Sequence, residues 1–323
     1  MKPLEEFPRI GLGVFPTPIQ RLENISSLLG TNVYVKWDDL TGLGLGGNKT
    51  RKLEFLLADA KRQGAEVVFT TGGAQSNHAM LTAASAGKLG MKAVLILKRR
   101  GVTDCVGNLL LERLMGTEVR FLDTDDFGEI YDEMDRVGAA MGKPFYKIPL
   151  GGSDPVGTLG YVACAREIRD QGIPFRHIVC AEGSGGTMAG LTLGARLYLP
   201  ETWVHGMLVD RGPFEEITCD LMERTAALLE AEVTVSRQDF DLLDMSGPGY
   251  AVPSAEGNEA VCLLAAREGL FLDPVYTGKA FAGLLRMAEE GAFTPEDNVL
   301  FLHSGGAGGL FAVPMKGVES EWD

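Results

Sequence analysis

The stretch "LGLGGNKTRKLEF", residues 43–55, decides the fold because it places a lysine directly after two glycines and an asparagine. Leucines recur at helical spacing beyond it and the pattern stops at Gly64, which predicts a helix over residues 51–64. Asn48 is a suitable N-cap for this helix, so Lys49 is expected in its first turn. A surface lysine does not require such a setting, whereas a lysine that bonds covalently to a bound molecule does.

The expected position of Lys49 would lower the pKa of its amine. The positive end of the helix dipole and the charge of Lys52, one turn further on, both disfavour a charged amine there. The neutral form is the nucleophilic one. A lone lysine is more often a solvated helix residue, but Gly46 and Gly47 favour the functional interpretation because glycines let a ligand approach closely.

Outward from this helix, strand-like and helix-like segments alternate, after a stretch that we interpret as an N-terminal arm. Strands are predicted at residues 66–73, 92–98, 118–123, 145–149, 176–183, 204–210 and 299–306. Helices are predicted at residues 76–90, 107–116, 127–142, 157–172, 187–199, 214–231, 260–269 and 278–291. Strands separated by helices indicate parallel sheets covered on both faces, so an α/β, doubly wound fold is expected.

Composition excludes several classes of partner. The 323 residues carry a formal net charge of −14, which argues against nucleic acid or an anionic membrane surface. No apolar stretch approaches the roughly 18 residues of a membrane-spanning helix, and the opening residues lack the apolar run of a signal peptide. The five cysteines are scattered without a C-x-x-C pair, which favours free thiols and a cytoplasmic location.

Three glycine-rich turns follow predicted strands, at residues 70–78, 181–190 and 302–309. Ligands of doubly wound folds bind beyond the carboxyl ends of strands, so we expect these turns to converge. The motif "GSGGT", residues 183–187, gives the strongest phosphate signal, because glycine amides and a helix N-terminus both attract an oxyanion. Its spacing fits neither a dinucleotide fingerprint nor a P-loop, and an ordinary strand-to-helix turn is an equal alternative on this motif alone.

Two further groups of side chains are candidates for a site. Ser76 and Asn77 begin a helix after a glycine turn and suit a carboxylate or phenolate oxygen, although both are also good N-caps and His78 alone is more often structural. Tyr250 and Tyr276 lie among Gly and Pro, where a ring can stack on a ligand, although each alone fits an aromatic residue at the edge of the core. The histidines lack metal-ligand spacing and no G-x-S-x-G motif is present, so neither a metal nor a Ser-His-Asp site is expected.

Taken together and in order, these motifs resemble the pyridoxal-phosphate enzymes of the tryptophan-synthase-β-like fold, fold type II. The resemblance is greatest to the D-cysteine desulfhydrase and 1-aminocyclopropane-1-carboxylate deaminase family. It spans almost the whole chain and rests on "FPTPIQRL", "GGNKTRKLEFLLADA", "GGAQSNHA", "GSGGTMAGL", "GPGY", "DPVYTGKAFAGL" and "HSGGAGGLFA".

The resemblance implies a cofactor, a site and a domain organisation. Pyridoxal 5′-phosphate would bond covalently to Lys49, which would also be the base for the α-proton of a small amino-acid substrate. The other implied cofactor contacts are Lys52, Asn77, Gly183, Ser184, Gly185, Gly186, Thr187, Tyr276, Thr277 and Ser304. The implied substrate contacts are Ser76, Asn77, His78 and Tyr250, with Ser76, Tyr250 and Tyr276 as catalytic residues beside Lys49. A large domain of residues 1–49 and 159–323 would be interrupted by a small domain of residues 50–158. Each domain would have an open, doubly wound sheet, the cofactor would lie in the cleft between the domains, and the protein would be a homodimer.

Residue 277 discriminates between reactions within the resembled family. Cyclopropane-opening deaminases have "VYEG" here, with a glutamate that keeps the ring nitrogen protonated, whereas this chain has "VYTG". A weaker electron sink favours β-elimination, with D-cysteine giving pyruvate, sulfide and ammonia. The alternatives are an L-cysteate sulfo-lyase or another β-eliminating lyase, then a cyclopropane deaminase, and, in a different class, a non-catalytic nucleotide-binding α/β module.

The sequence also departs from the resembled family. Where members often have "SNHxRQ", this chain has Met80 and Leu81, and "HSGG" replaces the "HTGG" of D-cysteine desulfhydrases. The two apolar residues leave the shape of the substrate pocket open. A dianionic substrate would need a further cation, for which Arg99 and Arg100 are candidates that the sequence alone does not place.

Overall fold

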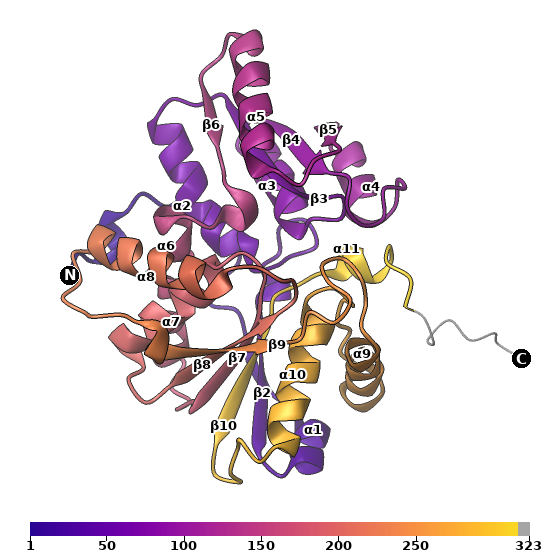
Figure 1. Ribbon diagram of the computed structural model, residues 1–323. Coiled ribbons are helices and arrows are strands. Elements are labelled where there is room, and N and C mark those ends of the chain that lie inside the picture. Colours follow the sequence, from indigo (N-terminus) through magenta and orange to yellow (C-terminus); the bar gives the residue numbers. More distant parts are fainter. Residues whose placement is uncertain (316–323) are drawn as a thin grey trace, which may run out of the picture.

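The computed structural model describes residues 1–315 and contains two sheets of mostly parallel strands (Figure 1). The larger sheet has the strand order β1-β2-β10-β7-β8-β9 and the smaller one has the order β5-β4-β3-β6. Only β1 pairs antiparallel, with β2, among the strands of the described residues. The predicted α/β fold with two open, doubly wound sheets is confirmed.

The strands and helices have the following bounds. The strands are β1 (Ile19–Arg21), β2 (Asn32–Trp37), β3 (Val67–Gly73), β4 (Lys92–Lys98), β5 (Glu118–Leu122), β6 (Phe145–Lys147), β7 (His177–Glu182), β8 (Trp203–Leu208), β9 (Phe240–Asp244) and β10 (Asn298–His303). The helices are α1 (Glu23–Leu29), α2 (Lys49–Arg62), α3 (Asn77–Lys88), α4 (Gly107–Leu114), α5 (Phe127–Met141), α6 (Pro155–Asp170), α7 (Gly186–Tyr198), α8 (Phe214–Leu228), α9 (Ala255–Glu268), α10 (Thr277–Glu289) and α11 (Ala307–Leu310). Short 3-10 helices cover Leu4–Glu6, Asp38–Leu40, Leu150–Gly152 and Arg237–Asp239.

Each sheet is buried between helices. One core of the larger sheet contains residues of α6, α7 and α8, and the other contains residues of α1, α9 and α10. The smaller sheet packs against α2 and α3 on one face and against α5 on the other. Because both faces are covered, the central strands are apolar runs without alternation, as in "VVF" of β3 and "VLIL" of β4.

The sequence analysis missed three strands of the larger sheet, namely β1, β2 and β9, of which β1 is only three residues long. The segment interpreted as an N-terminal arm contains β2, which pairs with β10. Its apolar pattern is interrupted by Lys36, whose side chain is fully buried and bonded to Glu167. The strand β9 is short and has aspartates at its second and last positions, which hides it as well. Strand propensity is therefore overridden by tertiary pairing in β2 and β9.

The smaller sheet is an insertion in the larger one. Its strands β3 to β6 are consecutive in the chain and lie between β2 and β7 of the larger sheet. In Figure 1 the smaller sheet lies at the top and the larger one below, with α2 and α6 between them. The domain boundaries at residues 49/50 and 158/159 stay a prediction. No helix within residues 1–315 is both long and apolar enough to cross a membrane.

A buried ion cluster fixes the start of α2 against the larger sheet. Arg51 is 1% exposed and bonds Asp38 twice, from Nε to Oδ2 and from Nη2 to Oδ1, both at 2.8 Å. It also donates to Glu167 of α6 at 2.9 Å, and the Tyr161 hydroxyl donates to Asp38 at 2.6 Å. Burial alone would raise the pKa of Asp38, but the adjacent Arg51 holds it below its ordinary value. Asp38 is therefore a charged partner.

Replacement of Arg51 should destabilise the fold strongly. Arg51→Met leaves Asp38 buried without its main counter-charge, which costs about 3–5 kcal/mol of unfolding free energy. Arg136→Met is the matched control, because Arg136 lies exposed on α5 and pairs only with Glu133 of the same helix among the described residues. The control should cost less than about 1 kcal/mol. Urea unfolding of both variants measures the difference, and equal losses would contradict the role given to the buried cluster.

Candidate active site

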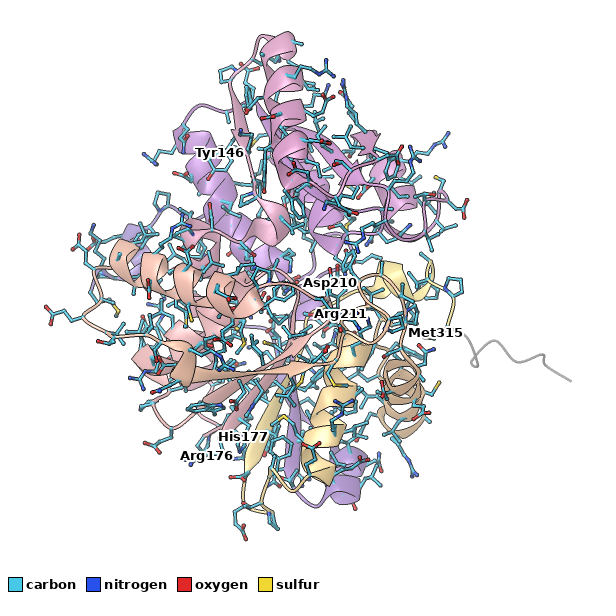
Figure 2. All side chains as sticks on the ribbon, viewed as in Figure 1. Tyr146, Arg176, His177, Asp210, Arg211 and Met315 are labelled. Atoms are coloured by element: carbon cyan, nitrogen blue, oxygen red, sulfur yellow. The ribbon has the colours of Figure 1, made fainter. Side chains whose placement is uncertain are left out.

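The three glycine-rich turns converge where the carboxyl ends of both sheets face each other. A Cβ on Gly305 would lie 2.9 Å from the Cα of Gly47, one on Gly183 would lie 3.7 Å from the ring of Tyr276, and one on Gly73 would lie 2.8 Å from the ring of Tyr250. The expected convergence of the turns is thus present in the structure. In Figure 2, Asp210 and Arg211, just beyond the end of β8, lie toward the smaller sheet, whereas Arg176 and His177 lie at the opposite edge.

Lys49 is the first residue of α2, and the glycines before it serve the backbone. Gly46 has φ +72°, and a Cβ there would lie 1.5 Å from the carbonyl oxygen of Asp39. Gly47 has φ +136° and lies close to the carbonyl oxygen of Ser304. The glycines therefore allow the chain, rather than a ligand, to approach closely, which corrects the reason that we gave for them from the sequence.

Asn48 is the N-cap residue of α2, as predicted, but its side chain does not bond the first turn. Its side chain accepts no hydrogen bond from the helix and instead donates from Nδ2 to Thr187 Oγ1 at 3.1 Å. Its backbone N–H donates to the carbonyl of Ser304 at 3.0 Å. The predicted N-cap position is confirmed, but the side-chain capping bond is absent because a partner outside the helix holds the amide. Asn48 thus fixes Lys49 relative to both the 183–187 turn and the end of β10.

The amine of Lys49 is poised to be neutral. Burial lowers its pKa to about 8, while the carboxylate of Glu182 acts in the opposite direction. Burial, rather than the charge of Lys52, is the cause of the shift, so our expectation gave the right direction with the wrong main reason. About a tenth of this amine is uncharged at pH 7, far more than for an ordinary lysine, which suits a nucleophile or a base.

The turn of residues 183–187 meets Lys52 and Ser153. Gly185 has φ +85°, and a Cβ on Gly186 would lie 2.6 Å from Lys52 Nζ and 2.7 Å from Ser153 Oγ. Lys52 is fully buried and donates to the Gly151 carbonyl at 3.1 Å and to Ser153 Oγ at 3.2 Å. Ser153 Oγ in turn accepts from the Gly186 amide at 3.2 Å. Glycine at position 186 is required for this close approach of a cation to the turn.

The 76–78 segment divides its three side chains between different tasks. Ser76 caps α3 by accepting from the Ala79 amide at 3.2 Å. His78 is buried, and its Nε2 bonds Thr70 Oγ1 at 2.8 Å, so the structure does not bring its ring toward a substrate. Burial and the charges of two lysines hold its pKa well below the ordinary value, so the ring is neutral. Of the three residues, Asn77 lines the cavity beside the tyrosines.

Tyr250 and Tyr276 act as a pair. Their hydroxyls are 2.6 Å apart, and both rings line the same cavity as Asn77 and Arg100. The guanidinium of Arg100 lies 6.0 Å from the ring centre of Tyr250. Lys279 holds the turn that carries Tyr250, because its buried amine donates to the carbonyls of Ser246 and Gly249 at 2.7 and 2.9 Å.

Thr277 and Ser304 are buried at the base of the site. Thr277 Oγ1 donates to Asp273 Oδ1 at 2.7 Å and accepts from the Asp273 amide at 2.8 Å. Asp273 also accepts from the amides of Val275 and Tyr276. The proton of the Thr277 hydroxyl is therefore committed to Asp273, and this turn fixes the start of α10 and the position of Tyr276.

Sequence reasoning missed four residues that shape the site, namely Ser153, Glu182, Asp273 and Lys279. Two of them, Glu182 and Asp273, are acids next to glycine-rich or turn motifs, and Lys279 is a lysine in an otherwise apolar helix start. A charged residue in such a setting is a signal for a buried, partnered group. Ser153 carried no comparable signal, because only the fold brings α6 to the turn at residues 183–187.

The donor set fits an aldehyde that carries a phosphate. Lys49 supplies an amine that is partly neutral, the glycine turn supplies backbone amides at a helix N-terminus, and Lys52 supplies a buried cation beside that turn. The family model described as "Pyridoxal-phosphate dependent enzyme" matches residues 10–305. The chain belongs to this family. Its members depend on pyridoxal phosphate, and the present fold is their fold type II.

Similar proteins indicate to which group of the family the chain belongs. A Pyrococcus furiosus protein, provisionally named 1-aminocyclopropane-1-carboxylate deaminase, is 44% identical over 317 residues, covering 95% of this chain and 94% of its own. A crystal structure titled as that of an ACC deaminase homologue superposes with TM-score 0.89 at 42% identity, covering 95% and 94%. O-ureido-L-serine synthase, at 19% identity and TM-score 0.71 over 99% and 96%, shares the fold. The chain thus lies in the deaminase and D-cysteine desulfhydrase group.

The lowered pKa of Lys49 predicts how fast the cofactor-free protein captures an aldehyde. Capture requires the neutral amine, whose fraction rises about tenfold per pH unit below the pKa and levels off above it. With a pKa of about 8, the rate of adduct formation with pyridoxal should rise up to about pH 8 and then level off. Stopped-flow absorbance measures this rate, with Lys49→Arg as the control that forms no adduct at this position. A rate that still climbs steeply at pH 10 would contradict the assignment.

Proposed function

We propose that the protein is a pyridoxal-phosphate-dependent carbon–sulfur lyase that converts D-cysteine and water to pyruvate, hydrogen sulfide and ammonia. The observation that carries this proposal is the hydrogen bonding of Thr277. The proposal includes Thr277 and Ser304 beside the pyridine nitrogen of the cofactor. A cytoplasmic location and a homodimeric assembly are also part of the proposal.

A threonine with these bonds does not supply charge to a ring nitrogen. Its hydroxyl is neutral and bonded to Asp273, so Thr277 itself adds no negative charge that would stabilise a protonated nitrogen. A carboxylate at this position would keep the ring nitrogen protonated and make the ring a stronger electron sink. A weaker sink suffices when a thiolate leaves from the β-carbon. This supports elimination over opening of a cyclopropane ring.

We assign the steps of the reaction to side chains of the site. When bound, pyridoxal 5′-phosphate supplies a conjugated ring that accepts the electrons left at the substrate α-carbon. Lys49, with its lowered pKa, removes the α-proton as a base. Lys52 and the amides of residues 183–187 would hold the phosphate, and Tyr276 would pack against the ring.

The substrate is held from the side of the smaller sheet. The start of α3 offers the amides of Asn77 and His78 and the hydroxyl of Ser76 to the substrate carboxylate, since the Ser76 amide donates to the Gly73 carbonyl. The side chain of Asn77 would hold the 3′-oxygen of the cofactor. The amide of Asn77 is oriented for this by Asn108, whose Nδ2 donates to Asn77 Oδ1 at 2.7 Å. The hydroxyl of Tyr250, bonded to that of Tyr276, faces the leaving group and supplies a proton to it.

A second candidate is elimination from an amino acid with a β-sulfonate, such as L-cysteate. Arg100 favours it, because its guanidinium lines the cavity beside Tyr250. The long Arg100–Asp125 contact of 3.8 Å leaves this guanidinium available to a second anion. Ring opening of 1-aminocyclopropane-1-carboxylate, suggested by the names of the relatives, is the third candidate, and the Thr277 bonds disfavour it.

A substrate panel tests the proposal. The purified holoenzyme should release pyruvate and sulfide from D-cysteine, with kcat/KM at least about tenfold above that for L-cysteate, and no 2-oxobutyrate from 1-aminocyclopropane-1-carboxylate. Keto-acid, sulfide and sulfite assays distinguish the products. Predominant 2-oxobutyrate would overturn the proposal in favour of ring opening, and predominant sulfite would favour the second candidate.

The Arg100→Gln variant separates the two elimination reactions. If a β-sulfonate is the substrate, the variant loses at least about tenfold more kcat/KM for L-cysteate than for β-chloroalanine, because one charge-assisted contact contributes about 1.5–3 kcal/mol. Arg99→Gln is the matched control, since Arg99 has similar exposure and bonds Asp123 at 2.9 Å. Parallel losses for both substrates would remove Arg100 from the recognition of a second anion.

A further inference from the structure

Glu182 is a buried carboxylate bonded to the backbone of the phosphate turn. It is the last residue of β7 and is 1% exposed. Its Oε1 accepts from the Ser184 amide at 2.9 Å and from the Gly185 amide at 2.5 Å. These two amides belong to the set that, in the proposed function, holds the cofactor phosphate. The protein's own carboxylate therefore occupies donors that an external anion requires.

Two anions do not share these donors well. A backbone N–H directs its proton to one acceptor, and a carboxylate next to a phosphate in a buried site is repelled by it. Cations reduce the repulsion without removing it, since Lys49 and Lys52 of α2 are the positive groups that face Glu182 among the described residues. Both lysines have depressed pKa values because of their own burial.

The other elements around Glu182 add no positive charge. Cys180, on the same strand, is a buried thiol whose pKa burial raises, and the neighbouring strand β8 presents Gly206 to the side chain. Asp154, at the start of α6, faces Lys52 and adds negative charge. Burial raises the pKa of Glu182, while the Gly185 amide and the two lysines act against that shift. The carboxylate thus gains a proton readily when a second anion arrives.

We propose that the carboxylate of Glu182 takes the place of the cofactor phosphate on the Ser184 and Gly185 amides when no cofactor is bound. Binding of the phosphate displaces the carboxylate from these two amides, and the carboxylate then takes up one proton from solvent. The proposal rests on the cofactor site of the proposed function but not on the reaction performed there. The bound protein holds one more proton than the free protein, so affinity for the phosphate rises as pH falls toward the pKa of Glu182 in the free protein.

Proton uptake during cofactor binding tests the inference directly. The full-length protein is freed of cofactor with hydroxylamine and titrated with pyridoxal 5′-phosphate at pH 8, by calorimetry in two buffers of different ionisation enthalpy. Pyridoxal, which lacks the phosphate but reacts with the same amine, is the matched ligand. Wild-type protein should take up close to one more proton with the phosphorylated ligand than with pyridoxal. Equal proton uptake with both ligands would overturn the proposal.

The variants Glu182→Gln and Glu201→Gln complete the test. Glu182→Gln should abolish the extra proton uptake, and its affinity for pyridoxal 5′-phosphate should fall less steeply with rising pH than that of wild type, by up to about tenfold per pH unit. Glu201 is exposed at the amino end of β8 and should behave as wild type. If Glu182→Gln retains the wild-type proton uptake, the proposal is wrong and Glu182 only stabilises the turn through its two amide bonds. Should the substrate panel fail while this linkage holds, the proposed reaction is wrong and the inference stands.

Discussion

The buried contact between Arg51 and Asp38 is the constraint on which the site depends. It ties α2 to the end of β2, and Glu167 extends the tie to α6. Lys49 lies two residues before Arg51, so the position of its amine is fixed by a cluster of charges that water does not reach. Asn48 adds a second tie, to Thr187 on the phosphate turn. A base or nucleophile requires such fixed geometry, and here it comes from the larger sheet and not from flexible loops.

Two lysines and one glutamate of opposite charge lie close together in the site. Lys49 and Lys52 bring positive charge to the turn at residues 183–187, and Glu182 brings the opposing negative charge. Burial pushes the pKa values of both lysines down and that of Glu182 up, so each group moves toward its neutral form. Lys49, whose pKa burial lowers to about 8, can exchange a proton near physiological pH, which is the property that amino-acid chemistry on a covalent cofactor needs. At the other end of the site, Thr277 is a neutral hydroxyl bonded to the buried carboxyl group of Asp273.

Much of this could be predicted from the sequence, and the limits have physical causes. The alternating pattern predicted both sheets because buried parallel strands are apolar runs, and the glycine motifs located the turns that converge. The strand β2 was missed because Lys36 is buried with a partner distant in sequence, and such pairing leaves no local signal. The N-cap position of Asn48 was predicted correctly, but its side-chain partner was not, since Thr187 is far along the chain. Ser153 likewise became visible only through contacts that the fold creates, whereas the position of Glu182 beside a glycine-rich motif was a signal that we did not use. The predicted roles of Lys52, Asn77, Tyr250 and the other site residues rest on the resemblance and on the geometry described above.

The covalent bond between Lys49 and the cofactor is the central claim, and mass spectrometry tests it most directly. The native holoenzyme is reduced with borohydride, digested, and its peptides are weighed. The account predicts a peptide containing Lys49 with the added mass of a reduced pyridoxyl phosphate group, and no such addition in Lys49→Arg. An unmodified Lys49 peptide, or the same addition on Lys52 or Lys279, would contradict it.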